Sequence, residues 1–202
     1  MTGIEATAAV IQALEAEGLS YFLSGSLASN FYGIPRSTHD ADFVVQLGNA
    51  TVSVLLRHLG AEFRLDPQLS FETVTGTTRH VLDVAGEMPF QVEIFRLGDD
   101  AHDQARFCRR RQVFVPELHL RAFLPTPEDV IVTKLRWALL GRRSKDREDV
   151  RDVIAVQGGG LDWEYVFRWC DQHGTRDLLE EIRRSTGPAG NVPTGGAGPS
   201  VP

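Results

Sequence analysis

The sequence predicts an α/β (α+β) domain over residues 1–124, a helical region over 125–185 and a disordered tail over 186–202. Three observations support this division. Short β-like runs alternate with helical patterns up to residue 124, whereas only helical periodicity follows. The last stretch, "TGPAGNVPTGGAGPSVP", is rich in Gly and Pro and has almost no apolar bulk, so it cannot offset its ordering entropy.

Composition narrows the classes of function. The chain has 202 residues, of which 42% are hydrophobic and 24% charged, and its net charge is -6. Such a balance provides no global basic field to gather nucleic acid. The apolar runs are far below the roughly 20 residues of a membrane span, and the acidic N-terminus is unlike a signal peptide. We expect a cytoplasmic protein without a membrane partner. Cys108 and Cys170 lack CxxC spacing, so neither a zinc site nor a disulfide partner is expected.

The first 60 residues predict helices and strands in alternation. Residues 4–17 place apolar side chains at helical spacing, and Gly18 suits the C-terminal cap. "LSYFLSG" indicates a buried strand that ends at Gly25, and "SLASNFYG" indicates a helix that begins at Ser26. An extended loop follows, because a residue before proline avoids helical backbone. "DADFVVQL" carries strong β-formers, and "ATVSVLLRHLG" predicts an amphipathic helix.

The next segment predicts a hairpin, a short helix and further strand. Two β-like runs flank Gly86-Glu87 in "RHVLDVAGEMPFQVEIFRL". "DQARFCRRR" suits a short helix, and "QVFVPELHLRAF" predicts strand broken at Pro116. Thr126 as N-cap and Pro127 in the first turn begin the helical region. Further helices are expected in "KDREDVRDVIAV", "LDWEYVFRWCDQHG" and "TRDLLEEIRRS".

Two aspartates at the start of the second predicted strand are the first candidates for chemistry. The strand period of two places Asp40 and Asp42 on one face. Like charges so close need a cation between them, unless they are solvated turn residues. Carboxylate oxygens suit Mg²⁺, and a third carboxylate on an adjacent strand would complete a two-metal site. Glu93 in "QVEIF" is the candidate for that third ligand, and Asp83 in "VLDVA" is its rival.

The Gly25-Ser26 pair supplies the second half of a possible site. A strand that turns sharply into a helix exposes backbone N–H groups at the helix N-terminus, and the Ser26 hydroxyl adds a donor. Phosphate at this turn and metal at the two aspartates together describe metal-assisted phosphoryl or nucleotidyl transfer.

The segment "SGSLASNFYGIPRSTHDADFVV" resembles the nucleotidyltransferase-fold superfamily, which is DNA polymerase beta-like, and in particular small bacterial proteins related to abortive-infection toxins. The shared pattern is Gly-Ser at residues 25–26, "PRST" at 35–38 and "DAD" at 40–42. The resemblance continues through "PEDVIVTKLRWALLGRRSKDREDVRDVI" and covers roughly residues 4–182. The family has Val-Asp before a hydrophobic residue in its hairpin, whereas this chain has "VEI" at 92–94.

The resemblance implies a nucleotidyltransferase-like mixed β-sheet with flanking helices, followed by a C-terminal helical bundle. Asp40, Asp42 and Glu93 would be the catalytic residues and would bind two divalent ions, Mg²⁺ or alternatively Mn²⁺. The chain would transfer a nucleoside monophosphate from a nucleoside triphosphate to a small molecule, tRNA or protein, and release pyrophosphate. The implied nucleotide-binding residues are Gly25, Ser26, Arg36, Thr38, Lys134 and Asp149.

Other interpretations stay open for several residues. Arg36 could pair with a nearby acid, and Lys134 could extend to solvent. Asp149 belongs to a series of acids at every third residue, which also fits an exposed helix face. "RFCRRR" fits a solvated helix end. The alternative function is a degenerate member of the fold that binds nucleotide without turnover, including in a toxin–antitoxin context.

Overall fold

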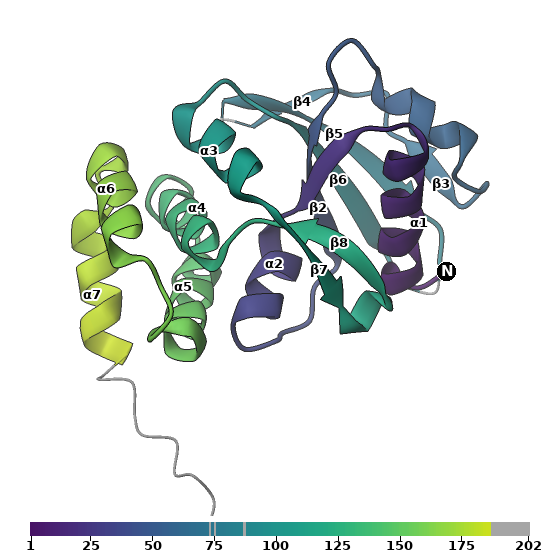
Figure 1. Ribbon diagram of the computed structural model, residues 1–202. Coiled ribbons are helices and arrows are strands. Elements are labelled where there is room, and N and C mark those ends of the chain that lie inside the picture. The colour runs from purple at the N-terminus through teal and green to yellow at the C-terminus, as the bar shows by residue number, and fades with distance from the viewer. Residues whose placement is uncertain (73, 75, 87, 187–202) are drawn as a thin grey trace, which may run out of the picture.

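The computed structural model describes residues 1–72, 74, 76–86 and 88–186. A sheet with helices against it forms the N-terminal part, and α4 to α7 lie together on one side of it (Figure 1). The helices are α1 Gly3–Ala16, α2 Gly25–Tyr32, α3 Ala101–Arg109, α4 Pro127–Leu140, α5 Ser144–Gln157, α6 Trp163–His173 and α7 Arg176–Thr186. The strands are β1 Ser20–Leu23, β2 Asp40–Gln46, β3 Phe63–Leu65, β4 Ser70–Glu72, β5 Thr77–Val84, β6 Phe90–Arg96, β7 Arg111–Val115 and β8 Leu120–Leu124.

The sheet is mixed, as the sequence predicted. Its order is β1-β2-β6-β5-β3, with β4 paired to β5, and β7 and β8 form a separate antiparallel pair. β2 runs parallel to β6 and antiparallel to β1. The predicted hairpin is confirmed, because β5 and β6 pair antiparallel with Val84 opposite Phe90.

Two local predictions differ from the structure. The segment around residues 50–60 forms the short 3-10 helix η1 Val52–Arg57 in place of the predicted amphipathic helix. The β-branched Thr51, Val52 and Val54 restrict side-chain rotamers and lower the helix propensity there. Thr126 does occupy the N-cap position of α4, but its hydroxyl donates to Asp129 Oδ2 at 2.9 Å and makes no capping hydrogen bond.

The two faces of the central strands have different partners. One face packs with α1 in a hydrophobic cluster that includes Ala41, Phe43, Val45, Val92 and Ile94. On the other face, Val44 and Phe95 pack with Phe107 of α3. Because strand residues alternate between faces, Asp40 and Asp42 share the second face. The predicted metal ligands therefore lie on the side of the sheet that faces α3.

A second hydrophobic cluster joins the C-terminal helices to α2. It contains Leu135 of α4, Val153 of α5 and Trp169 of α6, together with Ala28 of α2. α2 approaches α5 closely, since a Cβ at Gly33 would lie 3.1 Å from the Val153 nitrogen. The helical region thus packs directly on the element that follows the predicted phosphate turn, while a domain boundary near residue 124 stays a prediction.

Within the described residues, no helix combines the length and apolar character that crossing a membrane requires. The tail predicted over residues 186–202 lies, beyond residue 186, outside the described part of the chain.

Candidate active site

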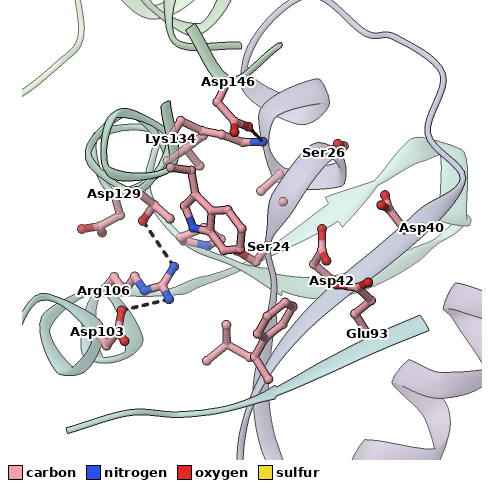
Figure 2. A pocket seen from close by; sticks show the side chains of 18 of the residues that line it. Ser24, Ser26, Asp40, Asp42, Glu93, Asp103, Arg106, Asp129, Lys134 and Asp146 are labelled. Carbon is pink, nitrogen blue, oxygen red and sulfur yellow. Dashed lines mark hydrogen bonds and ion pairs between the residues drawn. The ribbon is translucent and has the colours of Figure 1, made fainter. Parts of the chain in front are cut away.

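Three carboxylates from two neighbouring strands lie near one another on one face of the sheet (Figure 2). Asp40 and Asp42 alternate along β2 with Ala41 and Phe43, which are fully buried on the opposite face. β2 pairs in parallel with β6, and the register sets Asp42 beside Glu93. Cross-strand partners share a face, so Glu93 joins the two aspartates.

Asp83, the rival third acid, lies one strand further away. It stands on β5 opposite Gln91, and Gln91 in turn stands opposite Asp40. Its carboxylate accepts a hydrogen bond from Gln91 Nε2 at 3.0 Å and pairs with Arg64 at 3.2 Å. These two contacts, Gln91 first, hold the pKa of Asp83 below its usual value. The structure therefore brings Glu93, and not Asp83, beside Asp42.

The three acids are neutralised unequally. Thr38 Oγ1 donates to Asp40 Oδ1 at 2.6 Å, and Arg79 Nη1 lies 3.0 Å from Glu93 Oε1. In the described part of the chain, no hydrogen-bond donor reaches the Asp42 carboxylate. Burial, followed by the charges of Asp40 and Glu93, raises the pKa of Asp42 to about 7. A bound cation would reverse that shift, because opposite charge favours the ionised acid.

Gly25 allows the N-terminus of α2 to lie against Asp42. Its φ of +55° is left-handed, and a Cβ added there would lie 1.7 Å from Asp42 Oδ2. The Ser24 amide also donates to the Asp42 carbonyl oxygen at 2.7 Å. Only glycine meets both the backbone conformation and the lack of space. The sharp turn predicted at this point is present, and it sets the first N–H groups of α2 beside the acids.

Two serines on this turn line the same cavity. Ser26 is 5% exposed, and its Oγ accepts a hydrogen bond from Arg36 Nη2 at 3.0 Å, which leaves the hydroxyl hydrogen able to donate. Ser24 is the N-cap residue of α2, yet its side chain makes no capping hydrogen bond. The sequence pattern indicated Ser26 and missed Ser24, because the resemblance rests on the Gly-Ser pair that follows it.

A cluster of paired charges lies on the helical side of the cavity (Figure 2). Lys134 Nζ lies 2.9 Å from Asp146 Oδ1 and 2.7 Å from Asp149 Oδ2. Arg36 Nε lies 2.8 Å from Asp149 Oδ1 on the other side. Burial on its own would raise the pKa of Asp149, but the Arg36 hydrogen bonds and the Lys134 charge hold it below its usual value.

This geometry corrects three interpretations. Lys134 does not extend to solvent, because it is 7% exposed and paired to two acids. Asp146 and Asp149 are buried, so they do not belong to an exposed helix face. Asp149 turns its carboxylate toward Arg36 and Lys134 and does not line the cavity, although the resemblance implied that it binds nucleotide together with Lys134. For Arg36, the pairing with an acid is the alternative that the structure shows.

The cavity between the two clusters has a volume of 180 Å³. The sheet forms one wall, and residues of α3 and α4 form the other (Figure 2). Lys134, Arg143 and Lys145 bring positive charge to the helical side, and the Arg143 guanidinium lies 5.0 Å from the Trp137 ring centroid. The site thus sets cationic side chains opposite a group of carboxylates. The space between them suits a ligand that has anionic groups for the cations and a bound cation for the carboxylates.

No protein-family profile matches the sequence, and no curated protein does. Solved structures do match. An antigenic nucleotidyltransferase-like protein from Paracoccidioides brasiliensis is 14% identical with a TM-score of 0.56, over 90% of this chain and 92% of that one. The antibiotic-resistance factor ANT(2'')-Ia is 13% identical with a TM-score of 0.57, over 90% and 96%. Its structure in complex with adenylyl-2''-tobramycin is 14% identical to this chain with a TM-score of 0.53, over 88% of this chain and 99% of that one. The chain has the nucleotidyltransferase fold.

On this nucleotidyltransferase fold, the residues predicted from the sequence divide into two groups. Those that line the cavity are Gly25, Ser26, Asp40, Asp42, Glu93 and Lys134. Those that lie one contact behind it are Arg36, Thr38 and Asp149. The second group holds the first in place, since each of its members bonds to a cavity residue.

A buried polar network between α3, α4 and α6 was missed by sequence reasoning. Asp129 is fully buried, and it accepts hydrogen bonds from Tyr165 Oη at 2.6 Å and from Thr126 Oγ1 at 2.9 Å. Arg106 is 4% exposed and pairs with Asp103 at 2.9 Å, so the interpretation of "RFCRRR" as a solvated helix end is wrong for this arginine. The acid-to-arginine spacing of three within α3 was the available local signal.

Two histidines next to this network are also perturbed. Burial lowers the pKa of His102, and it lowers the pKa of His173 to about 4. Both rings are therefore neutral at neutral pH.

Proposed function

We propose that this protein is a metal-dependent nucleotidyltransferase that moves a nucleoside monophosphate from a nucleoside triphosphate to an acceptor and releases pyrophosphate. The observation that carries the proposal is the convergence of Asp40, Asp42 and Glu93 opposite the N-terminus of α2 and Lys134, around one cavity on the nucleotidyltransferase fold. The activity is our proposal, because structural neighbours at 13–14% sequence identity establish the fold alone.

The carboxylates fit divalent ions. The Asp42 carboxylate receives no donor from the described residues, and its raised pKa reports an anion that lacks a partner. Hard oxygen ligands favour Mg²⁺, with Mn²⁺ as the alternative, and the three acids suffice for a pair of ions. Bound ions would neutralise charge on the reacting phosphate and on the attacking and leaving oxygens.

The turn before α2 and the basic side chains fit a triphosphate. The first N–H groups of α2 and the Ser24 and Ser26 hydroxyls offer donors, and Lys134 offers a positive charge. Asp149 is an acceptor only and cannot bond to phosphate, so we assign it the role of holding Lys134 and Arg36. Thr38 orients Asp40 in the same way.

The acceptor side follows from the third carboxylate. Glu93 would take the proton from an acceptor hydroxyl that lies beside it. ANT(2'')-Ia has been solved with adenylyl-2''-tobramycin, so a small molecule is the first acceptor class to test, before tRNA or protein. A toxin–antitoxin role and a cytoplasmic location stay predictions from the sequence.

One observation favours the second candidate, a nucleotide-binding module without turnover. Arg79 holds both oxygens of Glu93 at 3.0 and 3.1 Å, so the third carboxylate already has a cationic partner. If that pair persists with nucleotide bound, Glu93 neither binds metal nor accepts a proton.

Pyrophosphate release separates the two candidates. The protein is incubated with Mg²⁺, each nucleoside triphosphate in turn and a cell extract as the source of acceptor, and the labelled product is identified. We expect Asp42→Asn to lower pyrophosphate release by orders of magnitude. Asp83→Asn is the matched control, because this acid lies on the same sheet outside the cavity and its loss should leave release unchanged. Nucleotide binding without pyrophosphate, equal in the wild type and the control, would favour the module.

A further inference from the structure

A second cluster of ligand-type side chains lies outside the cavity, between α3 and α6. Asp100 is the N-cap of α3, His102 lies in its first turn, and His173 is the last residue of α6. One ligand atom from each lies within 4.8 Å of the others. The cluster therefore joins a helix that follows the sheet to the C-terminal helices.

The ring nitrogens in this cluster lack partners. His102 is fully buried, and within the described residues its Nδ1 and the Nδ1 of His173 have no hydrogen bond. A buried polar atom without a partner is costly, so such an atom calls for a ligand. Asp100 accepts hydrogen bonds from the His102 and Asp103 amides and from Arg136, all at Oδ1. Its second oxygen, Oδ2, accepts none of these hydrogen bonds.

The surroundings resemble the support that a metal-binding histidine needs. His102 Nε2 lies 3.3 Å from Asp129 Oδ1 without the geometry of a hydrogen bond. A small turn of the ring would let its N–H donate to that carboxylate, as the second nitrogen of a ligating histidine usually does. Asp129 is itself fixed by Tyr165. The Trp169 ring lies 4.9 Å from the His102 ring and 5.7 Å from the His173 ring, which shields the cluster from water.

We propose that Asp100, His102 and His173 bind one divalent transition metal, with water as the fourth ligand. Two imidazoles and a carboxylate are the ligands that Zn²⁺ favours, whereas Mg²⁺ takes oxygen ligands. In a tetrahedral zinc shell the ligand atoms lie about 3.3 Å apart, so small rotamer changes close the present spacing. The sequence pattern indicated no zinc site, because the two cysteines lack metal-ligand spacing and His173 is distant from Asp100 and His102 along the chain.

The metal would fasten α6 to α3. Asp129 lines the catalytic cavity and contacts His102, so the fastening would also stiffen the α3–α4 wall of that cavity. This inference is independent of the proposed transferase activity, since none of the three ligands belongs to the acids at Asp42.

Zinc titration of the chelator-stripped full-length protein tests the site. Bound zinc is measured by elemental analysis and the melting temperature by calorimetry. We expect one zinc per chain and a higher melting temperature. His173→Gln should weaken zinc binding at least tenfold, as should Asp100→Asn, which keeps a good N-cap residue while removing the charged ligand. Circular dichroism checks that each variant is folded. If His173→Gln does not fold, zinc binding by Asp100→Asn decides the outcome.

Two matched controls locate the ion. His58→Gln removes a histidine at the end of η1, far from the cluster in sequence, and should retain zinc. Asp42→Asn removes a carboxylate of the catalytic cavity and should also retain it. Absence of zinc binding, equal binding in wild type and in both cluster variants, or loss of zinc in Asp42→Asn alone would each overturn the proposal.

Discussion

Two charged clusters lie on opposite sides of one cavity, and they differ in charge balance. On the sheet, Arg79 pairs with Glu93, while Asp42 has no donor and its pKa is raised to about 7. On the helical side, Lys134 of α4 and Arg36 of the loop before β2 together neutralise the Asp149 carboxylate of α5, whose pKa is lowered. The shifts have opposite signs although both sites are partly buried. We infer that the balanced cluster stabilises the fold, whereas the unbalanced one is held in readiness for a cation.

The largest stability effect is expected in the balanced cluster. Lys134→Met leaves Asp146 and Asp149 buried with one cation fewer, which should lower the free energy of unfolding by about 3–5 kcal/mol. Denaturant titration measures it. Lys145→Met is the matched control, since this lysine is exposed and its loss should change stability by less than about 0.5 kcal/mol. Equal losses in both variants would contradict the distinction between the clusters.

Asp42→Asn should change stability in the opposite direction and raise the free energy of unfolding. Without divalent ions, the folded protein binds a proton at Asp42 more tightly than the unfolded chain, because the pKa is raised from 3.8 to about 7. The stability linked to that proton is complete below the unfolded pKa and is lost as pH rises through the folded pKa. The amide has no such loss, so its advantage over wild type should grow to the order of 4 kcal/mol above neutral pH.

Unfolding measured in chelator from about pH 5 to about pH 8 follows this difference. Asp83→Asn is the reference, because the lowered pKa of Asp83 makes its contribution to stability present at neutral pH and lost on acidification. A pH-independent difference between wild type and Asp42→Asn would mean that Asp42 is not an unpaired anion.

Sequence reasoning predicted the sheet class and the acids of β2 because both depend on local patterns. Alternation alone places Asp40 and Asp42 on one face. The choice between Glu93 and Asp83 required the pairing of β2 with β6, which joins segments distant along the chain and leaves no local mark. Both acids sit in similar β-like runs, so the sequence could only name them as rivals.

The same limit explains the helical errors. An acid at every third residue of α5 has the same appearance whether the face is solvated or packed on α4. Only the packed helices show that Lys134 meets Asp146 and Asp149. The buried His102 and His173 belong to different helices and to no motif, so nothing in the sequence brings them together.

The Gly25 turn gives the next test. Gly25→Ala adds a Cβ at positive φ and into the Asp42 carboxylate, so we expect a loss of about 1–3 kcal/mol from the backbone alone. It should also abolish the rise in melting temperature that we expect Mg²⁺ and nucleotide to give the wild type. Gly18→Ala is the matched control, because Gly18 has a φ of +64° and no atom within 4 Å of the added Cβ. That variant should lose only the backbone part of this stability and should keep the expected ligand-induced rise.

The smallest effect on stability is expected at Ser26. Ser26→Ala removes one hydrogen-bond acceptor from Arg36 Nη2, which keeps its bond to Asp149 Oδ2 at 3.0 Å. The free energy of unfolding should therefore fall by only about 1 kcal/mol. The hydroxyl hydrogen of Ser26 is free for phosphate, so triphosphate affinity should fall about tenfold. Ser29→Ala is the control: its hydroxyl donates to the Gly25 carbonyl oxygen at 2.9 Å, and Ser29 does not line the cavity. Calorimetry should show similar stability losses in the two variants but weaker nucleotide binding in Ser26→Ala alone. Equal nucleotide affinities in the two variants would mean that Ser26 only holds Arg36. The phosphate would then be bound at this turn by the backbone N–H groups of α2 and not by the Ser26 hydroxyl.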